Sequence, residues 1–246
     1  MRVALLAMLL GLGLFVALPS AAIAAQPATT ADDAFEDDDP FAKKEKATVP
    51  PLADPIKPVN KAFYHVNDKL YFWLLKPVAQ GYAFVLPKIA RKGVRNFFSN
   101  VGTPVRMVSC LFQGDLKGTG TELARFGVNT TVGVAGLGDP AIGWLKLKKR
   151  KEDFGQTFGY WGIGPGFYIT WPMLGPSSLR DTAGMPFNMA LNPATYVPGV
   201  GLLNRINTTS LSIGEYEDIK DAALDPYVAI RDGYNQYRRR AVKSWD

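Results

Sequence analysis

Few residues of this 246-residue chain have the types and spacing that covalent catalysis requires. His65 is the only histidine, so a serine nucleophile would depend on this one residue as its general base. Ser177-Ser178 follows Gly175-Pro176 and does not form the G-x-S-x-G turn that presents a hydrolase nucleophile. An isolated histidine is usually structural or exposed. We therefore expect no catalytic residue and no enzyme activity.

Metal and cofactor sites have as little support. With His65 and Cys110 as the only histidine and cysteine, no zinc or transition-metal site of normal ligand number can be assembled. Glu152-Asp153 and Glu217-Asp218 are adjacent pairs, and adjacent side chains on a helix do not face each other. The glycines of the 162–166 segment lack the strand–loop–helix context of a phosphate loop. The sequence predicts no metal and no cofactor.

Residues 1–24 have the features of a cleaved signal peptide. Arg2 precedes an apolar run from Val3 to Leu18, and Ala22 and Ala24 fit a small-residue cleavage site. A retained anchor is the alternative, but the run is shorter than the ~20 residues of a spanning helix. No cysteine lies directly after this apolar run, so the lipid-attachment site of a bacterial lipoprotein is absent. Cys110, within an apolar segment, is expected to be a small core residue.

Charge divides the remaining chain into two parts. Residues 25–53 contain seven acidic residues against three lysines, a net charge of −4, and predict a disordered acidic linker. Residues 54–246 contain 15 acidic and 24 basic residues, a net charge of +9. Such a surface suits lipid headgroups, lipopolysaccharide phosphates or nucleic acid. Export disfavours nucleic acid, so we expect no nucleic-acid partner.

Apolar spacing predicts one mainly helical domain over residues 54–240, followed by a tail at 241–246. The first helix has Asp54 as its cap and ends at Lys76-Pro77. Tyr71, Phe72 and Trp73 lie near its end beside lysines. The helix can be an amphipathic core helix or, because tryptophan and tyrosine suit the headgroup level, a helix at a membrane interface. Its apolar stripe comprises Ile56, Val59, Phe63, Val66, Leu70 and Leu74.

Six further helices are predicted with short connections, typical of a compact helical assembly. They cover about 87–100, 104–113, 116–130, 201–223 and 225–240, and one more begins after Ser177 as its cap. Asp115 caps the third of these, and Asp225 caps the last with Pro226 as its first residue. We expect Ile89 and Phe187 to face the protein interior.

The segment from Gly155 to Pro172 is rich in glycine and aromatic residues. Two short apolar runs flank Gly164-Pro165-Gly166, which predicts a β-hairpin with a turn at these residues. In a soluble protein this aromatic surface would promote aggregation. We expect lipid or a partner to cover it, with Trp161 and Trp171 at the membrane interface.

An ordered series of segments resembles the MlaA/VacJ family. No single segment is specific for this family, but the order of the segments over about 54–240 is specific for it. They include Val59-Asn60-Lys61-Ala62-Phe63, Leu75-Lys76-Pro77-Val78, Gly93-Val94-Arg95-Asn96-Phe97-Phe98, Leu111-Phe112-Gln113-Gly114, Arg125-Phe126-Gly127-Val128-Asn129-Thr130-Thr131, Glu152-Asp153-Phe154-Gly155-Gln156-Thr157-Phe158-Gly159, Leu174-Gly175-Pro176-Ser177-Ser178-Leu179-Arg180-Asp181 and Asp225-Pro226-Tyr227-Val228.

The resemblance implies a ring-like bundle of amphipathic helices with a short hairpin, seated in the inner leaflet of the bacterial outer membrane on its periplasmic side. A central amphipathic channel would take mislocalised phospholipids from the outer leaflet, maintaining lipid asymmetry. Trimeric porins and a periplasmic lipid carrier are the implied partners. The family's hairpin corresponds to about 160–171, with Gly162, Gly164 and Gly166 as its flexible points. Many members are lipoproteins, and this chain departs from them in lacking the acylated cysteine.

Polar residues inside apolar motifs are the candidates for headgroup contacts. Each has a structural hydrogen bond within the ring as its alternative role. Two other functions remain open: an envelope adaptor that binds porins without moving lipid, and a lipid-cleaving enzyme that would depend on His65. The headgroup candidates are Arg95, Asn96, Asn129, Thr130 and Arg180.

Overall fold

The computed structural model describes residues 50–243. The predicted signal peptide and all but the last residues of the predicted acidic linker lie outside this range. The described chain is mainly helical with one two-stranded hairpin, as predicted. The last helix continues to Lys243, three residues beyond the predicted end of the domain.

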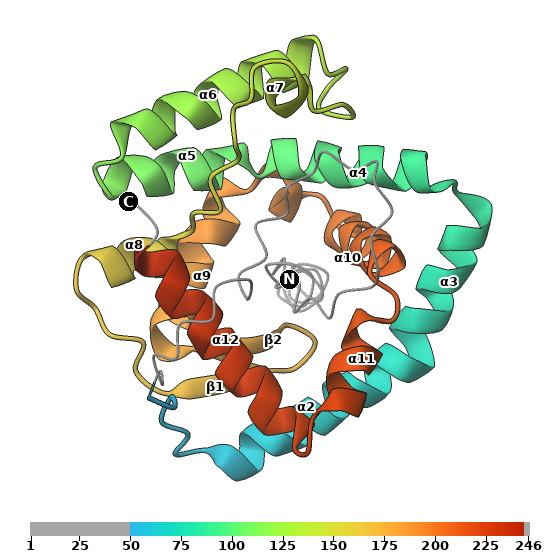
Figure 1. Ribbon diagram of the computed structural model, residues 1–246, viewed down its shortest axis with the longest axis vertical. Helices are drawn as coiled ribbons and strands as arrows, with labels where there is room; N and C mark the ends of the chain where they lie inside the picture. The colour runs from blue at the N-terminus through green and yellow to red at the C-terminus, as the bar shows by residue number, and fades with distance from the viewer. Residues whose placement is uncertain (1–49, 244–246) are drawn as a thin grey trace, which may run out of the picture.

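The helices follow one another around a closed ring (Figure 1). α2, α3, α4 and α5 form successive sides, with α6 outside α5. The chain then returns through α8, the hairpin and α9, and α10 packs against both α3 and α4. The first half comprises α2 (Lys57–Leu70), η1 (Tyr71–Leu75), α3 (Lys76–Val85), α4 (Lys88–Val101), α5 (Thr103–Phe112), α6 (Leu116–Thr131) and α7 (Pro140–Gly143). The second half comprises α8 (Phe154–Tyr160), β1 (Tyr168–Trp171), β2 (Gly175–Ser178), α9 (Leu179–Leu191), η2 (Pro193–Tyr196), α10 (Val200–Leu211), α11 (Glu215–Ala222) and α12 (Pro226–Lys243).

The first helix differs from its prediction at both ends. It begins at Lys57, and the Asp54 carboxylate accepts a hydrogen bond from the Asn60 side chain (2.7 Å) instead of capping the helix. It does not end at Lys76-Pro77, because a π-helical turn, η1, joins α2 to α3. Pro77 then falls in the first turn of α3, directly after the π-helical turn.

The predicted hairpin was wrong in its position. β1 pairs antiparallel with β2, Tyr168 opposite Ser178, so the turn lies at 172–174 and not at Gly164-Pro165-Gly166. The expected first arm is helical instead, as α8, because the Asp153 side chain caps it by accepting from the Gln156 N–H (2.9 Å). The three glycines lie in the connection from α8 to β1.

Other boundaries follow the predicted cap residues more closely. Asp115 caps α6, and α12 begins at Pro226 after Asp225, as predicted. Ser178 rather than Ser177 caps α9, since Ser178 Oγ accepts from the Asp181 N–H (3.2 Å). The predicted helix at 201–223 is two helices, separated at Gly214, whose φ of 106° is left-handed.

Two asparagines on α2 join the hairpin to the first helix and so close the ring. Asn60 donates to the Tyr168 carbonyl (3.0 Å) and accepts from the Thr170 N–H (2.7 Å). Asn67, two turns further on, donates to the Trp171 carbonyl (2.9 Å) and accepts from the Met173 N–H (2.6 Å). Each side chain therefore continues the hydrogen-bonding of a strand edge.

We expect Asn60→Ala to lower the free energy of unfolding by about 3 kcal/mol, because it leaves a buried donor and a buried acceptor without partners. Asn67→Ala should cost less, since the Met173 end of its contact is exposed to water. Chemical denaturation of both variants measures the difference. Equal losses would contradict this role of burial.

Candidate lipid-facing surface and polar core

Large apolar side chains lie on the outside of the protein. Phe84 is 93% exposed, Ile89 84%, Trp73 76% and Val85 75%. Others, including most of the α2 stripe predicted from the sequence, are also exposed: Ile56, Val59, Val66, Leu74, Val78, Leu111, Phe112, Leu116, Leu123, Val132, Val134, Trp144 and Leu202. Where exposed apolar side chains gather in large patches, they mark a surface that a partner or a membrane covers.

The interior of the described chain is correspondingly polar. Asn60, Glu122 and Asn207 have no exposed surface, and Gln156 is 2% exposed. The buried apolar cluster is small and mostly aromatic, built from Leu52, Tyr168, Tyr227 and Tyr234. More of the buried residues are polar or charged than apolar, unlike the usual core of a water-soluble protein.

Charged side chains link helices around the ring. The Arg106 guanidinium donates to the Glu122 carboxylate (2.7 Å), and Glu122 also accepts from the Arg150 N–H (2.7 Å). Arg125 forms an ion pair with Asp139 (2.7 Å). Where apolar surroundings remove the hydrophobic drive for helix association, polar contacts of this kind and close helix packing hold helices together.

Close packing is clearest between α8 and α9. A Cβ atom at Gly184 would lie 2.6 Å from the backbone nitrogen of Gly155, and one at Gly155 would lie 2.4 Å from an Asp181 oxygen. Only glycine therefore permits this approach. The contact brings Asp153, which caps α8, near Asp181 in the first turn of α9.

Arg238 of α12 joins these two carboxylates. It donates to both oxygens of Asp153 (2.6 and 2.8 Å) and, through Nε, to Asp181 (2.7 Å), while the Tyr234 hydroxyl also donates to Asp181. Burial alone would raise the pKa of Asp153, but the Arg238 guanidinium outweighs it and lowers this pKa to about 2. Both carboxylates are thus held in the charged form.

The lowered pKa predicts a stability change at acid pH. The folded protein favours the deprotonated form of Asp153 more than the unfolded chain does. The ionised carboxylate therefore contributes its full stabilisation of the fold above the usual pKa of 3.8. It is lost as pH falls through about 2. We expect up to about 2 kcal/mol of unfolding free energy to be lost between pH 5 and 2 from this group. Denaturation across this range should show a shallower pH slope for Asp153→Asn, and an unchanged slope would contradict the assignment.

The aromatic residues predicted at a membrane interface have different surroundings. Trp73 is exposed, with the Lys69 ammonium 5.6 Å from its ring centroid. The Tyr71 hydroxyl donates to Glu217 (2.9 Å), and Phe72 lies half-buried beside it. These contacts tie η1 to α11, so within this group Trp73 has the surface best placed for lipid.

The two tryptophans near the hairpin are both anchored by their indole N–H groups. Trp161 is half exposed and donates to the Phe112 carbonyl (3.0 Å), and half-buried Trp171 donates to Thr182 Oγ1 (3.0 Å). Trp161 therefore belongs to the exposed aromatic surface, whereas Trp171 mainly stabilises the packing of β1 on α9.

Three of the five headgroup candidates come together where α4 meets α6. Asn96 donates to the Leu137 carbonyl (3.3 Å), and Thr130 Oγ1 accepts from Asn100 (2.9 Å). Asn129 is buried, donating to Asp139 and accepting from the Ala141 N–H. These contacts give Asn129 a buried structural role, whereas Thr130 is exposed and the hydrogen bond of Asn96 is open to solvent.

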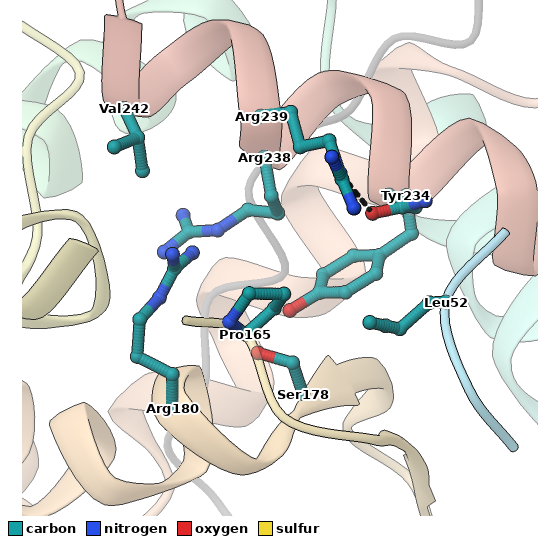
Figure 2. A pocket seen from close by; sticks show the side chains of 9 residues that line it. Leu52, Pro165, Ser178, Arg180, Tyr234, Arg238, Arg239 and Val242 are labelled. Atoms are coloured by element: carbon teal, nitrogen blue, oxygen red, sulfur yellow. Dashed lines mark hydrogen bonds between the residues drawn. The ribbon is translucent and has the colours of Figure 1, made fainter. Parts of the chain in front are cut away.

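Arg95 and Arg180 lie elsewhere. Arg95 is exposed on α4. Arg180 is 7% exposed at the start of α9, where its Nε donates to Asp181 (3.0 Å). Figure 2 shows its guanidinium beside that of Arg238 at a pocket of about 170 Å³.

Of the predicted flexible glycines, Gly162 and Gly166 have left-handed φ values of 87° and 69°. A Cβ at Gly166 would meet Leu179 at 2.9 Å, whereas nothing lies within 4 Å of one at Gly162 or Gly164. The segment joins α8 to β1 through Pro165, which lines the pocket in Figure 2.

Sequence reasoning missed Asn60, Asn67 and Arg238 as organising residues. Asn60 and Asn67 are seven residues apart, which places them on one face of a helix. This spacing could have indicated that they act together. Arg238 had no comparable local signal. Its buried role depends on Asp153 and Asp181, which no local pattern connects to it.

The other sequence expectations concern chemistry. His65 is exposed, with its ring 5.2 Å from that of Tyr64, and Cys110 is fully buried, as predicted. Within residues 50–243, no three His, Cys, Asp or Glu side chains group in a way that would hold a metal ion. In the same range, none of the helices is both long and apolar enough to cross a membrane.

Comparison with known proteins identifies relatives of this chain. The family model described as MlaA lipoprotein matches residues 52–241. The intermembrane phospholipid transport system lipoprotein MlaA of Escherichia coli is 31% identical over 193 residues, which cover 75% of this chain and 76% of that protein. An uncharacterised protein of Rickettsia felis is 32% identical over 197 residues, 77% of this chain and 78% of its own length.

A solved structure has the same fold. It was described as the structural basis for maintenance of bacterial outer membrane lipid asymmetry, and it superimposes with a TM-score of 0.69 at 28% identity. The match covers 77% of this chain and 99% of the other.

Proposed function

Because this chain belongs to the MlaA lipoprotein family, we propose that it moves phospholipid between membranes of the cell envelope. In this proposal the ring lies in the inner leaflet of the outer membrane, on its periplasmic side. It removes mislocalised phospholipids from the outer leaflet through a central amphipathic channel and so maintains lipid asymmetry. A trimeric porin and a periplasmic lipid carrier are its proposed partners.

The observation that carries the proposal is the reversed polarity of the chain. Exposed Phe84, Val85 and Ile89 suit contact with acyl chains, while buried Asn60, Glu122 and related residues help to hold the helices together around a small apolar core. Helices that lie in one leaflet need not span the bilayer, which agrees with the lengths found in residues 50–243.

The proposed chemistry is solvation and not bond formation. A phospholipid crosses a bilayer slowly because its charged headgroup must enter hydrocarbon. A path with polar walls lowers this barrier while the tails remain in apolar surroundings. No nucleophile, base or metal is required, so we propose that the protein is not an enzyme.

Deleting the gene in its native host tests the proposal. We expect phospholipid to accumulate in the outer leaflet, measured by chemical labelling of surface phosphatidylethanolamine, and expect expression of the intact chain to reverse it. Unchanged labelling after deletion would contradict phospholipid removal. Purified porin complexes that lack bound phospholipid, together with unchanged labelling, would favour the adaptor function instead.

A further inference from the structure

The pocket in Figure 2 contains more cationic hydrogen-bond donors than the protein itself uses. We call it the arginine pocket. It lies between the C-terminal half of α12, the start of α9 and the connection that follows α8. Its lining residues are Leu52, Pro165, Ser178, Arg180, Tyr234, Asn235, Arg238, Arg239 and Val242.

The three arginines differ in how far their donors are satisfied. Arg238 directs all three of its guanidinium nitrogens at Asp153 and Asp181. Arg180 uses Nε for Asp181, and Arg239 uses Nε for Asn235 Oδ1 (3.1 Å). The Nη groups of Arg180 and Arg239 make no hydrogen bond or ion pair with any residue in the described range.

Burial makes the unused donors of Arg180 significant. The Arg180 side chain is only 6% exposed, and the face of its guanidinium lies close to Gly159, where a Cβ would meet Nη1 at 2.7 Å. The Arg180 side chain is thus almost fully buried while its Nη groups have no protein partner, and an anion in the pocket would pair with them.

Charge and geometry indicate the class of that anion. Arg180, Arg238 and Arg239 together carry one positive charge more than Asp153 and Asp181 compensate. The backbone N–H groups at the start of α9 are already bonded to Phe167, Pro165 and Ser178, so the guanidinium forks are the donors available. Such forks match the paired oxygens of phosphate.

The remaining walls of the arginine pocket suit an ester rather than a bare ion. Leu52, Pro165 and Val242 contribute apolar surface, and the Ser178 and Tyr234 side chains are polar but uncharged. We propose that the pocket binds a phosphate group, supplied by a phospholipid headgroup. This inference rests on the proposed function, which provides the lipid, whereas the phosphate site itself can be tested without it.

The test measures binding to the purified mature protein in detergent by isothermal titration calorimetry. The probes are dihexanoylphosphatidylglycerol below its critical micelle concentration and, separately, inorganic phosphate. The variants are Arg180→Gln with Arg239→Gln, and Arg239→Gln alone, which leaves the Asp153–Arg238–Asp181 contacts untouched. Arg240→Gln is the matched control, because it removes the same charge from the same helix outside the pocket.

We expect the double variant to bind the short-chain lipid at least ~10-fold more weakly, the loss that follows from removing charge-assisted hydrogen bonds. Arg239→Gln should have an intermediate effect, and Arg240→Gln should stay within about twofold of the unmodified protein. Loss of inorganic phosphate binding alone, with lipid binding unchanged, would support the phosphate site but identify the free ion as its ligand.

Equal binding of both probes by the unmodified protein and the double variant would overturn the arginine pocket, as would binding of neither probe by the unmodified protein. Outer-leaflet labelling separates this outcome from failure of the proposed function. A strain that carries the double variant and still clears surface phospholipid would keep the function while the pocket is rejected.

Discussion

Replacing Arg238 with leucine should lower the free energy of unfolding by about 3–5 kcal/mol, the largest loss that we expect from a single substitution. Arg238 is 6% exposed, and its guanidinium pairs with two carboxylates from two other segments. Without it, the partly buried Asp153 would lose its ion pair, and the buried Asp181 would keep only Arg180 as a cationic partner. Burial of an unpaired charge costs far more than the loss of an exposed ion pair.

Chemical denaturation in detergent, followed by circular dichroism, measures this loss. Arg240→Leu is the control, since Arg240 is exposed on the same helix, and we expect it to change stability by less than about 1 kcal/mol. Adding Asp153→Asn to Arg238→Leu should recover part of the stability, because it removes one of the stranded charges. A double variant no more stable than Arg238→Leu alone would show that Arg238 acts through packing instead.

The second large effect concerns the corner between α3 and α4. Phe84 and Ile89 are almost fully exposed there. In a soluble protein, exchanging such residues for aspartate would be close to neutral or stabilising. In a lipid leaflet, each buried charge would cost up to about 3 kcal/mol of membrane affinity. The two environments therefore predict opposite outcomes for Phe84→Asp with Ile89→Asp.

We expect this double variant to shift from the membrane-bound to the unbound fraction in flotation with vesicles of native phospholipid. Lys88→Asp is the matched control, because it lies between the two positions, is exposed and changes the net charge by the same two units. It should float nearly as well as the unmodified protein. Equal flotation of all three proteins would mean that this corner does not contact acyl chains.

Helix positions were largely predictable from the sequence, whereas the side that each helix buries was not. α4, α5 and α6 lie within one or two residues of their predicted ranges, because Gly102, Asp115 and the apolar spacing are local signals. Ile89 and Phe187 were expected to face inward, and both are exposed. Periodicity identifies an apolar face but cannot say whether a protein core or a lipid phase covers it.

The errors have a common physical cause in long-range contacts. Asp54 could have capped the first helix, but its contact with Asn60 beneath the hairpin takes precedence. The 162–166 glycines have the composition of a hairpin turn, yet the strands pair further along the chain, where the Asn60 side chain of α2 bonds to Tyr168 and Thr170 of β1. Of the headgroup candidates, which were chosen as polar residues in apolar motifs, Asn129 and Arg180 are buried, whereas Arg95 and Thr130 are exposed.

Contact between the outer surface of the ring and acyl chains is the central claim, and collisional accessibility at position 84 tests it most directly. A nitroxide attached at Phe84→Cys can be placed selectively, because Cys110 is fully buried and burial raises the pKa of its thiol to about 12. In proteoliposomes, the label should collide more often with oxygen, which concentrates in hydrocarbon, than with a water-soluble nickel chelate. A label on exposed Arg240→Cys provides the comparison. Higher accessibility to the nickel chelate at position 84, equal to that at position 240, would contradict the account.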